Sequence, residues 1–232
     1  MRASVIIPVK DEAENVKPLC SAFAELVQSD RTVGEILFVD DHSRDSTLAE
    51  VKTMAQTLPI LRAVPLDSQH GKGATIRRGF MEAQFEILVM MDGDQQYTPF
   101  DLPKLLAPIL NGSVDLVIGK GGDCYSSAFR RFSSRSFRWA FTQMFGFYVD
   151  CPNEGLKAIL KSKFNELNLT SNNFDFDIEL LVKARQRSFR MAEVTITRKE
   201  RAAGKSKIHI ISTTVRFSVK LVRLWFTQRK WL

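Results

Sequence analysis

The chain has 232 residues, of which 44% are hydrophobic and 25% are charged, with a net charge of +7. This length and composition suit a globular protein of one large domain or two small ones, and no repeat or low-complexity tract argues otherwise. The three cysteines, Cys20, Cys124 and Cys151, are widely spaced and form no C-x-x-C pair. They therefore indicate a reducing compartment and neither a disulfide framework nor a zinc knuckle.

The net charge is distributed unevenly along the chain. Residues 183–232 contain 14 Lys and Arg against two acids, a balance of +12, whereas residues 1–182 contain 19 against 24, a balance of −5. A polybasic end indicates an anionic partner surface, such as lipid headgroups or nucleic acid. The alternative is a charged face that only meets solvent. The opening, MRASVIIPV, lacks the pattern of a secretory signal, so we expect the mature chain to begin at Met1.

Short apolar runs alternate with amphipathic segments along the first half of the chain. They predict strands over 4–9, 35–41, 60–66, 86–94 and 114–119, and helices over 14–28, 46–57, 73–84 and 101–110. Buried strands separated by helices indicate an open α/β domain with a Rossmann-like, mostly parallel sheet and helices on both faces. Ligands of such domains bind at the carboxyl ends of the strands. Acidic residues gather at those ends here.

The second half is less regular but continues the same domain. We predict helices over 127–147 and 176–187 and strands over 154–160 and 190–198. One continuous domain then spans 1–207, followed by a basic amphipathic helix over 208–232. Arg216, Lys220 and Arg223 interrupt this last segment too often for a membrane span, so we expect it to lie in the headgroup region of a bilayer. The alternative is a terminal helix that packs on its own domain or on a second copy.

The stretch LVMMDGDQQY (88–97) leads from a buried strand into two acids, Asp92 and Asp94. A turn at Gly93 can aim both carboxylates at one point, and a divalent cation is the natural occupant of that point. Mg²⁺ or Mn²⁺ would take these oxygens together with waters and substrate phosphates, and Gln96 could add a carbonyl oxygen. The alternative is a pair of ordinary loop acids.

Two neighbouring stretches strengthen the metal and phosphate interpretation. In FVDDHSRDST (38–47), Asp40 or Asp41 can accept hydrogen bonds from a ribose or a base, although helix capping would account for some of the acids nearby. In HGKGATIRRG (70–79), Lys72 stands at a helix start, where an anion is favoured. The stretch does not have the spacing of a Walker A loop, which disfavours a P-loop ATPase.

With these motifs in this order, the chain resembles glycosyltransferase family 2, whose members have the GT-A fold. The likeness is to its dolichyl-phosphate mannose synthase and polyprenyl-phosphate glycosyltransferase branch and covers roughly residues 3–207. It rests on SVIIPVKDEAENV, FVDDHSRDST, HGKGATIRRGFMEA, VMMDGDQQY, DCPNEGLKA, FDFDIELLVKA and EVTITRKERAAGKSK.

The resemblance implies a role for individual residues. Pro8, Glu12 and Asp41 would hold the nucleoside, and Asp92, Asp94 and Gln96 would surround the metal on the donor diphosphate. Arg201, Ser206 and Lys207 would belong to a loop that closes on phosphate. A lipid phosphate acceptor needs cations to position it, and Arg131 with its neighbours Arg130 and Arg135 fits that need. These arginines could instead merely coat a helix.

The expected function is a metal-dependent inverting transfer of a sugar from GDP-mannose or a UDP-sugar to a polyprenyl or dolichyl phosphate. The protein would act as a peripheral enzyme on the cytoplasmic face of a membrane, with a possible membrane-anchoring subunit and no nucleic-acid partner. A soluble or cell-surface glycan is the alternative acceptor, although the E-D pair and Q-x-x-R-W motif of such enzymes are missing. From another class, a non-catalytic membrane-associated module that binds nucleotide sugars remains open, as does a nucleic-acid binder, whose usual signatures are absent.

Overall fold

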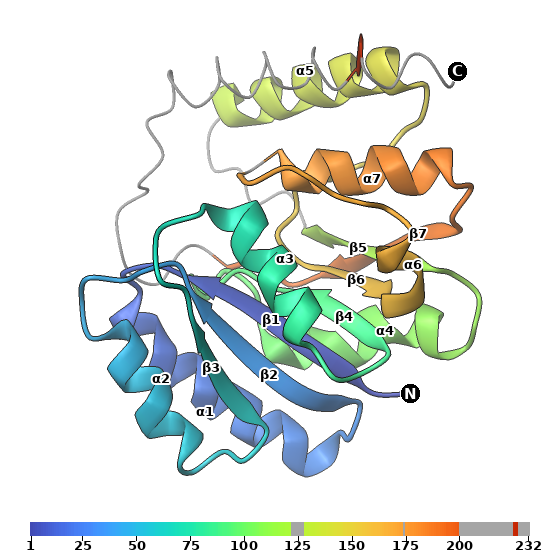
Figure 1. Cartoon of the computed structure of the whole chain (residues 1–232). Helices are drawn as coiled ribbons and strands as arrows, with labels where there is room; N and C mark the ends of the chain where they lie inside the picture. The colour runs from blue at the N-terminus through green and yellow to red at the C-terminus, as the bar shows by residue number, and fades with distance from the viewer. Residues whose placement is uncertain (122–127, 174, 200–224, 227–232) are drawn as a thin grey trace.

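The computed structural model describes residues 1–121, 128–173, 175–199 and 225–226, with side-chain positions for all of these except 128–134 (Figure 1). Seven strands and eight helical segments follow one another in this part of the chain. They are β1 (Ala3–Val9), α1 (Ala13–Ser29), β2 (Val33–Asp40), α2 (Thr47–Ala55), β3 (Leu61–Pro65), α3 (Lys72–Glu82), β4 (Ile87–Met90), η1 (Pro99–Asp101), α4 (Leu102–Leu110), β5 (Leu116–Gly121), α5 (Ala128–Phe145), β6 (Lys157–Leu160), α6 (Lys161–Asn165), α7 (Phe176–Gln186) and β7 (Met191–Ile196).

The strands form one sheet in the order β3-β2-β1-β4-β6-β5-β7. All neighbours pair in parallel except β6, which runs antiparallel to both β4 and β5. The expected mostly parallel sheet is therefore confirmed. The carboxyl ends of β1, β2 and β4 meet at one edge, and the antiparallel β6 begins at that same edge.

Helices cover the sheet on both faces, as the continuous apolar strands require. Side chains of α1, α2 and α4 form one core with one face of the strands, around buried Phe23, Phe38 and Leu105. Side chains of α3, α5 and α7 form a second core on the other face, around Phe80, Phe141 and Phe176. Figure 1 shows α5 as the outermost helix of this second layer, lying above α7.

The observed elements agree closely with the predicted ones, with three differences. β4 ends at Met90 rather than at 94, because the chain leaves the ladder after Met91 and turns beside β1. β6 begins only at Lys157, and the short elements η1 and α6 were not predicted. Most of the predicted helix over 208–232 lies outside the described residues. Within the described part of the chain, no helix is both long and apolar enough to cross a bilayer.

Candidate active site

Asp92 and Asp94 follow β4 at the carboxyl edge of the sheet. Gly93 between them packs on β1, where an added Cβ would lie only 3.0 Å from Val9 Cγ1. The Asp92 side chain is 28% exposed, whereas Asp94 is buried and its carboxylate accepts a hydrogen bond from the Gln96 N–H at 3.2 Å. The loop therefore offers one accessible carboxylate and one held from within the loop.

Lys72 brings a positive charge to these carboxylates from the start of α3. Its Nζ lies 2.6 Å from Asp92 Oδ1, and its side chain is only 16% exposed. Burial works to lower the pKa of the Lys72 ammonium, but the carboxylates of Asp92, Asp177 and Asp94 together raise that pKa above its ordinary value. The ammonium is therefore charged at neutral pH. The sequence predicted an anion beside Lys72, and in the structure the Asp92 carboxylate lies there.

Gly155 closes the other side of Asp92. The antiparallel pairing ends at Met90 and Lys157, and Gly155, two residues before Lys157, lies beside Asp92. An added Cβ at Gly155 would lie 2.2 Å from Asp92 Oδ2, a distance that no real contact allows. Sequence reasoning assigned Gly155 to a family segment but missed this contact, which arises only from the pairing of two distant strands.

The residues predicted to hold the nucleoside lie at the ends of β1 and β2. The buried carboxylate of Asp41 accepts hydrogen bonds from the backbone N–H groups of His70 (2.6 Å) and Gly71 (3.1 Å). It thereby fixes the loop that carries Lys72. Gly71 has a φ of +90°, which favours glycine, and it forms the N-cap of α3. Asp41 thus holds the Lys72 loop, and its contact with a nucleoside stays a prediction.

The other residues predicted to hold the nucleoside are Asp40, Glu12 and Pro8. The buried Asp40 carboxylate accepts hydrogen bonds from the backbone and hydroxyl of Ser43. Glu12 accepts a hydrogen bond from the Asn15 amide, and Pro8 lies in β1 at the same edge. The structure gathers all three near the strand ends, and their contacts with a nucleoside stay predictions.

A buried network joins the Asp92 loop to the chain that follows β7. The Tyr97 hydroxyl donates to Glu154 Oε1 at 2.6 Å and accepts from the Gly155 N–H at 2.9 Å. Burial raises the pKa of the Tyr97 hydroxyl far above its usual value, and the carboxylates of Asp92 and Glu154 add to that rise, so the hydroxyl stays a donor. The Arg198 guanidinium lies 3.5 Å from Glu154 Oε1.

Gln96 meets the same returning chain. Its backbone oxygen accepts from the Lys199 N–H at 2.8 Å, and its side-chain oxygen accepts from Arg198 at 3.5 Å. The chain just before the predicted phosphate loop thus touches the Asp92 loop. Arg201, Ser206 and Lys207 themselves lie outside the described residues, and their roles stay predictions.

A second cluster of cations surrounds Asp150. Its members are Lys120, at the end of β5, and Arg138, on α5. Lys120 and the Tyr148 hydroxyl hydrogen-bond its carboxylate and hold the pKa of Asp150 below its usual range. The Arg138 guanidinium lies 3.5 Å from Asp150 Oδ1. Sequence reasoning missed Lys120. It named the arginines of α5 instead, of which Arg135 is exposed and Arg130 and Arg131 lie outside the described side chains.

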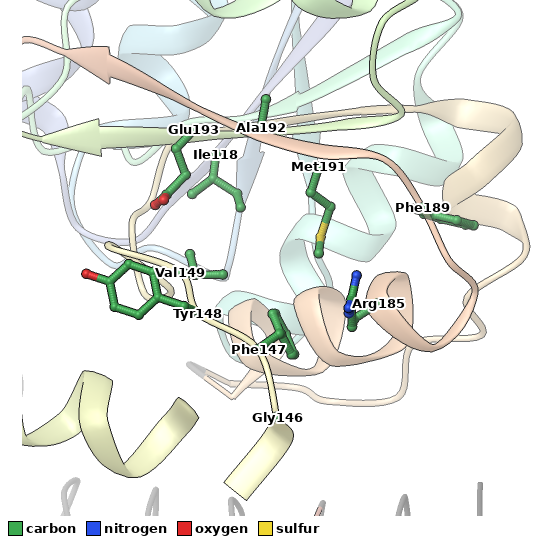
Figure 2. A pocket seen from close by; sticks show the side chains of 10 residues that line it. All are labelled: Ile118, Gly146, Phe147, Tyr148, Val149, Arg185, Phe189, Met191, Ala192 and Glu193. Carbon is green, nitrogen blue, oxygen red and sulfur yellow. The ribbon is translucent and has the colours of Figure 1, made fainter. Parts of the chain in front are cut away.

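A cavity of about 450 Å³ lies next to this cluster, between β7, α7 and the chain after α5 (Figure 2). Figure 2 shows the Met191 side chain pointing from β7 towards α7, with Glu193 near Tyr148 on one side and Arg185 on the other. Glu193 accepts from the backbone N–H groups of Asp150 and Cys151, so it braces the Asp150 segment. None of the carboxylates that follow β4 lines this cavity.

The donor set after β4 fits a hard divalent cation. Among the described residues, no group of three or more His, Cys, Asp or Glu side chains converges as a complete metal cage. Mg²⁺ and Mn²⁺ need no such cage, because they take one or two carboxylates and complete their shell with water and substrate phosphates. Asp92, Asp94 and the Gln96 amide oxygen are oxygen donors of this kind, and their role as metal ligands stays a prediction.

Comparisons with known proteins bear on the family and the fold of the chain. The sequence model described as Glycosyl transferase family 2 matches residues 4–167. The chain is 31% identical over 217 residues to the Dolichol-phosphate mannosyltransferase of Pyrococcus furiosus, a match that covers 90% of this chain but only 59% of that protein. It is 30% identical over 220 residues to the protein of the same name from Saccharomyces cerevisiae, covering 88% and 80%. It is 27% identical over 231 residues to the Dodecaprenyl-phosphate galacturonate synthase of Rhizobium johnstonii, covering 99% and 68%.

Solved structures share the fold at lower identity. Glucosyl-3-phosphoglycerate synthase from Mycobacterium tuberculosis, crystallised with Mn²⁺, UDP and glucosyl-3-phosphoglycerate, superposes with a TM-score of 0.75 at 19% identity. The same enzyme with Mg²⁺ and UDP gives a TM-score of 0.76 at 20% identity. Both matches cover 98% of this chain and 79% of the other. The expected GT-A fold is confirmed.

Proposed function

Because the chain belongs to glycosyl transferase family 2 and is a glycosyltransferase, we propose that it moves a sugar from a nucleoside diphosphate sugar to a polyprenyl or dolichyl phosphate. The donor would be GDP-mannose or a UDP-sugar. One observation carries this proposal: Asp92 and Asp94 leave β4 with Lys72 beside them, at the edge where β1 and β2 also end. The relatives named for dolichol phosphate and dodecaprenyl phosphate support the choice of acceptor.

The donor side of the reaction needs cations at the leaving group. When bound, Mg²⁺ or Mn²⁺ on Asp92, Asp94 and Gln96 would neutralise charge on the departing diphosphate. Lys72 can add a hydrogen bond and a second positive charge at the same place. Arg201 and Lys207, which follow Arg198 and Lys199 in the chain, would complete the phosphate contacts. Pro8, Glu12, Asp40 and Asp41 would hold the nucleoside, and Ser206 would join the closing loop.

The acceptor side needs positioning rather than a base. A lipid phosphate oxygen attacks the anomeric carbon as the bond to the diphosphate breaks, with inversion, and no proton has to be removed, since the phosphate is already an anion at neutral pH. Lys120 and Arg138 lie together around Asp150 near this edge of the sheet, and Arg131 belongs to the same helix, α5. These cations would orient the acceptor through charge-assisted hydrogen bonds.

The site of action follows from the acceptor. A polyprenyl phosphate is embedded in a bilayer, so the enzyme would work as a peripheral protein on the cytoplasmic face of a membrane. Residues 208–232 would meet its anionic surface, and a separate anchoring subunit could assist them.

A transfer assay tests the proposal directly. Purified protein is incubated with Mn²⁺ or Mg²⁺, a polyprenyl phosphate and a panel of labelled sugar nucleotides, and the label that enters organic solvent is counted. We expect transfer from one donor of the panel, a loss of about 100-fold or more in Asp92→Ala and Asp94→Ala, and no turnover in excess EDTA. Glu25→Ala, an exposed acid on α1, is the matched control and keeps full activity.

Two results would refute the proposal. One is full turnover in excess EDTA. The other is equal transfer by wild type, Asp92→Ala and Asp94→Ala, when thermal melts show that all three are folded.

A further inference from the structure

The two oxygens of the Asp92 carboxylate have different neighbours. Oδ2 lies beside Gly155, where an added Cβ would stand 2.2 Å from it. Oδ1 faces Lys72, whose Nζ lies 2.6 Å from it. The ammonium therefore occupies one of the two oxygens that Asp92 could offer to a divalent cation.

The two cations cannot share this oxygen without cost. Like charges repel strongly at a few ångströms in a site that is partly shielded from water. Asp94 is buried in the same loop and also acts on Lys72, so the ammonium lies in the field of both carboxylates. A bare metal ion must therefore displace the ammonium or tolerate it.

The backbone at Lys72 is anchored, whereas its ammonium group can move. Asp41 holds the backbone of His70 and Gly71, and the Asn172 oxygen accepts from the Gly73 N–H at 2.9 Å, so the start of α3 is anchored. The four-carbon stem of a lysine lets the ammonium change partners from such an anchored backbone. When the Lys72 ammonium moves away, the nearby Asp177 carboxylate keeps a cationic partner, because Lys157 pairs with it at 2.5 Å.

We propose that Lys72 is a place-holding cation, which neutralises Asp92 in the donor-free enzyme and releases it to the metal when a diphosphate arrives to receive the ammonium. This inference rests on the proposed function, since it takes a divalent cation and a diphosphate as the ligands of the site. Metal and diphosphate then bind with strong positive coupling, and each raises the affinity for the other by the same factor. Lys72 is the source of much of that coupling.

Replacing Lys72 by a neutral side chain separates the two ligands. In Lys72→Gln, Mn²⁺ alone should bind about fivefold more tightly, because nothing competes for Asp92, while pyrophosphate should bind more weakly. The coupling factor between the two should fall about tenfold or more. Lys72→Arg keeps the charge and should keep most of the coupling. Lys104→Gln makes the same charge change at an exposed position on α4 and should match wild type.

The measurement is a titration of Mn²⁺, followed by the EPR signal of the free ion, with and without inorganic pyrophosphate. Pyrophosphate carries no base, so the unknown nucleoside does not matter, and its own Mn²⁺ affinity is measured without protein and subtracted. Thermal melts of each variant show that the fold is retained. Unchanged or weaker Mn²⁺ binding in Lys72→Gln, or a coupling factor equal to that of wild type, would overturn the inference.

Asp92→Ala separates this inference from the proposed function. Mn²⁺ binding with pyrophosphate that persists in Asp92→Ala contradicts the metal site of the proposed function. Binding that requires Asp92 but has the same coupling in wild type and Lys72→Gln overturns the place-holding role alone.

Discussion

Asp92 is held from two sides by neighbours of opposite kind. Lys72 attracts one carboxylate oxygen, and Gly155 leaves room for the other. The glycine acts by having no side chain, since any Cβ at this position would push the carboxylate away. The position of Asp92 is therefore set by shape as well as by charge.

Gly155→Ala should displace Asp92 without removing any charged group. The new Cβ would stand 2.2 Å from Oδ2, and a displacement of about 1 Å in a catalytic group can cost about 100-fold in rate, so we expect sugar transfer to fall by about that factor. The transfer assay and thermal melts are run together. Gly112→Ala is the control: its φ of +73° costs about 1 kcal/mol of stability, but open space surrounds it and transfer should be unchanged. Wild-type transfer in Gly155→Ala would contradict this view of the site.

Helix α7 supports the site through the segment that precedes it. The Glu179 carboxylate accepts hydrogen bonds from the Thr170 N–H and from the Ser171 N–H, the latter at 2.7 Å, and pairs with Lys183 at 2.8 Å. The same segment continues to Asn172, whose oxygen anchors the start of α3. The Glu179 carboxylate on α7 thus helps to position Lys72 indirectly, through the segment 170–172.

Glu179 should make part of the stability depend on pH. Burial works to raise the pKa of its carboxyl, but the hydrogen bonds from Lys183, Ser171 and Thr170 outweigh burial and lower that pKa. The contribution is therefore complete above the unfolded pKa of about 4.3 and is lost as pH falls through the lower folded pKa. Glu179→Gln should cost about 1–3 kcal/mol in the free energy of unfolding at pH 7, and this difference should shrink below about pH 4.

Urea unfolding of wild type and Glu179→Gln between pH 7 and pH 3 measures this difference. Glu166→Gln removes a charge from a half-exposed pair with Lys163 and should change stability little at any pH. A difference between wild type and Glu179→Gln that stays constant over the whole pH range would argue against the ionised carboxylate as its source.

The elements show what the sequence could and could not predict. The apolar runs that end in Asp40 and Asp92 are short and β-branched, so the strands and the acids at their ends were predictable. The contact of Asp92 with Gly155 was not, because it depends on an antiparallel strand inserted beside β4. The partners of Asp150 escaped for a similar reason: Lys120 is distant in sequence and is brought close only by the sheet.

Charge and exposed rings are placed unevenly over the whole molecule. Residues 183–232 have a balance of +12. Trp139 on α5 (68% exposed), Tyr148 (62%) and Phe226 (60%) are large rings left open among the described residues, and Trp225 packs on the core that contains Phe141. Aromatic rings and cations together favour the headgroup region of an anionic bilayer.

Vesicle binding should therefore depend on salt and on the C-terminal charges. We expect the protein to sediment with vesicles that contain phosphatidylglycerol, and Lys220→Glu/Arg223→Glu to weaken this binding by at least about tenfold, since each cation near the surface contributes about 1 kcal/mol. High salt should weaken it as well. Lys17→Glu/Lys52→Glu makes the same charge change at exposed positions on α1 and α2 and should bind like wild type. Binding that is indifferent to salt and to the C-terminal pair would exclude an electrostatic attachment.

The hydrogen bond between Tyr97 and Glu154 has a consequence for how such a chain can diversify. The polypeptide departs at Tyr97, builds α4, β5 and α5, and comes back at Glu154, so this bond ties both ends of a long excursion. Lengthening a closed excursion is thermodynamically cheap, at about 0.6 kcal/mol for each doubling of its length. Longer loops between these elements should therefore cost little stability, while the Tyr97–Glu154 hydrogen bond keeps the two ends of the excursion together.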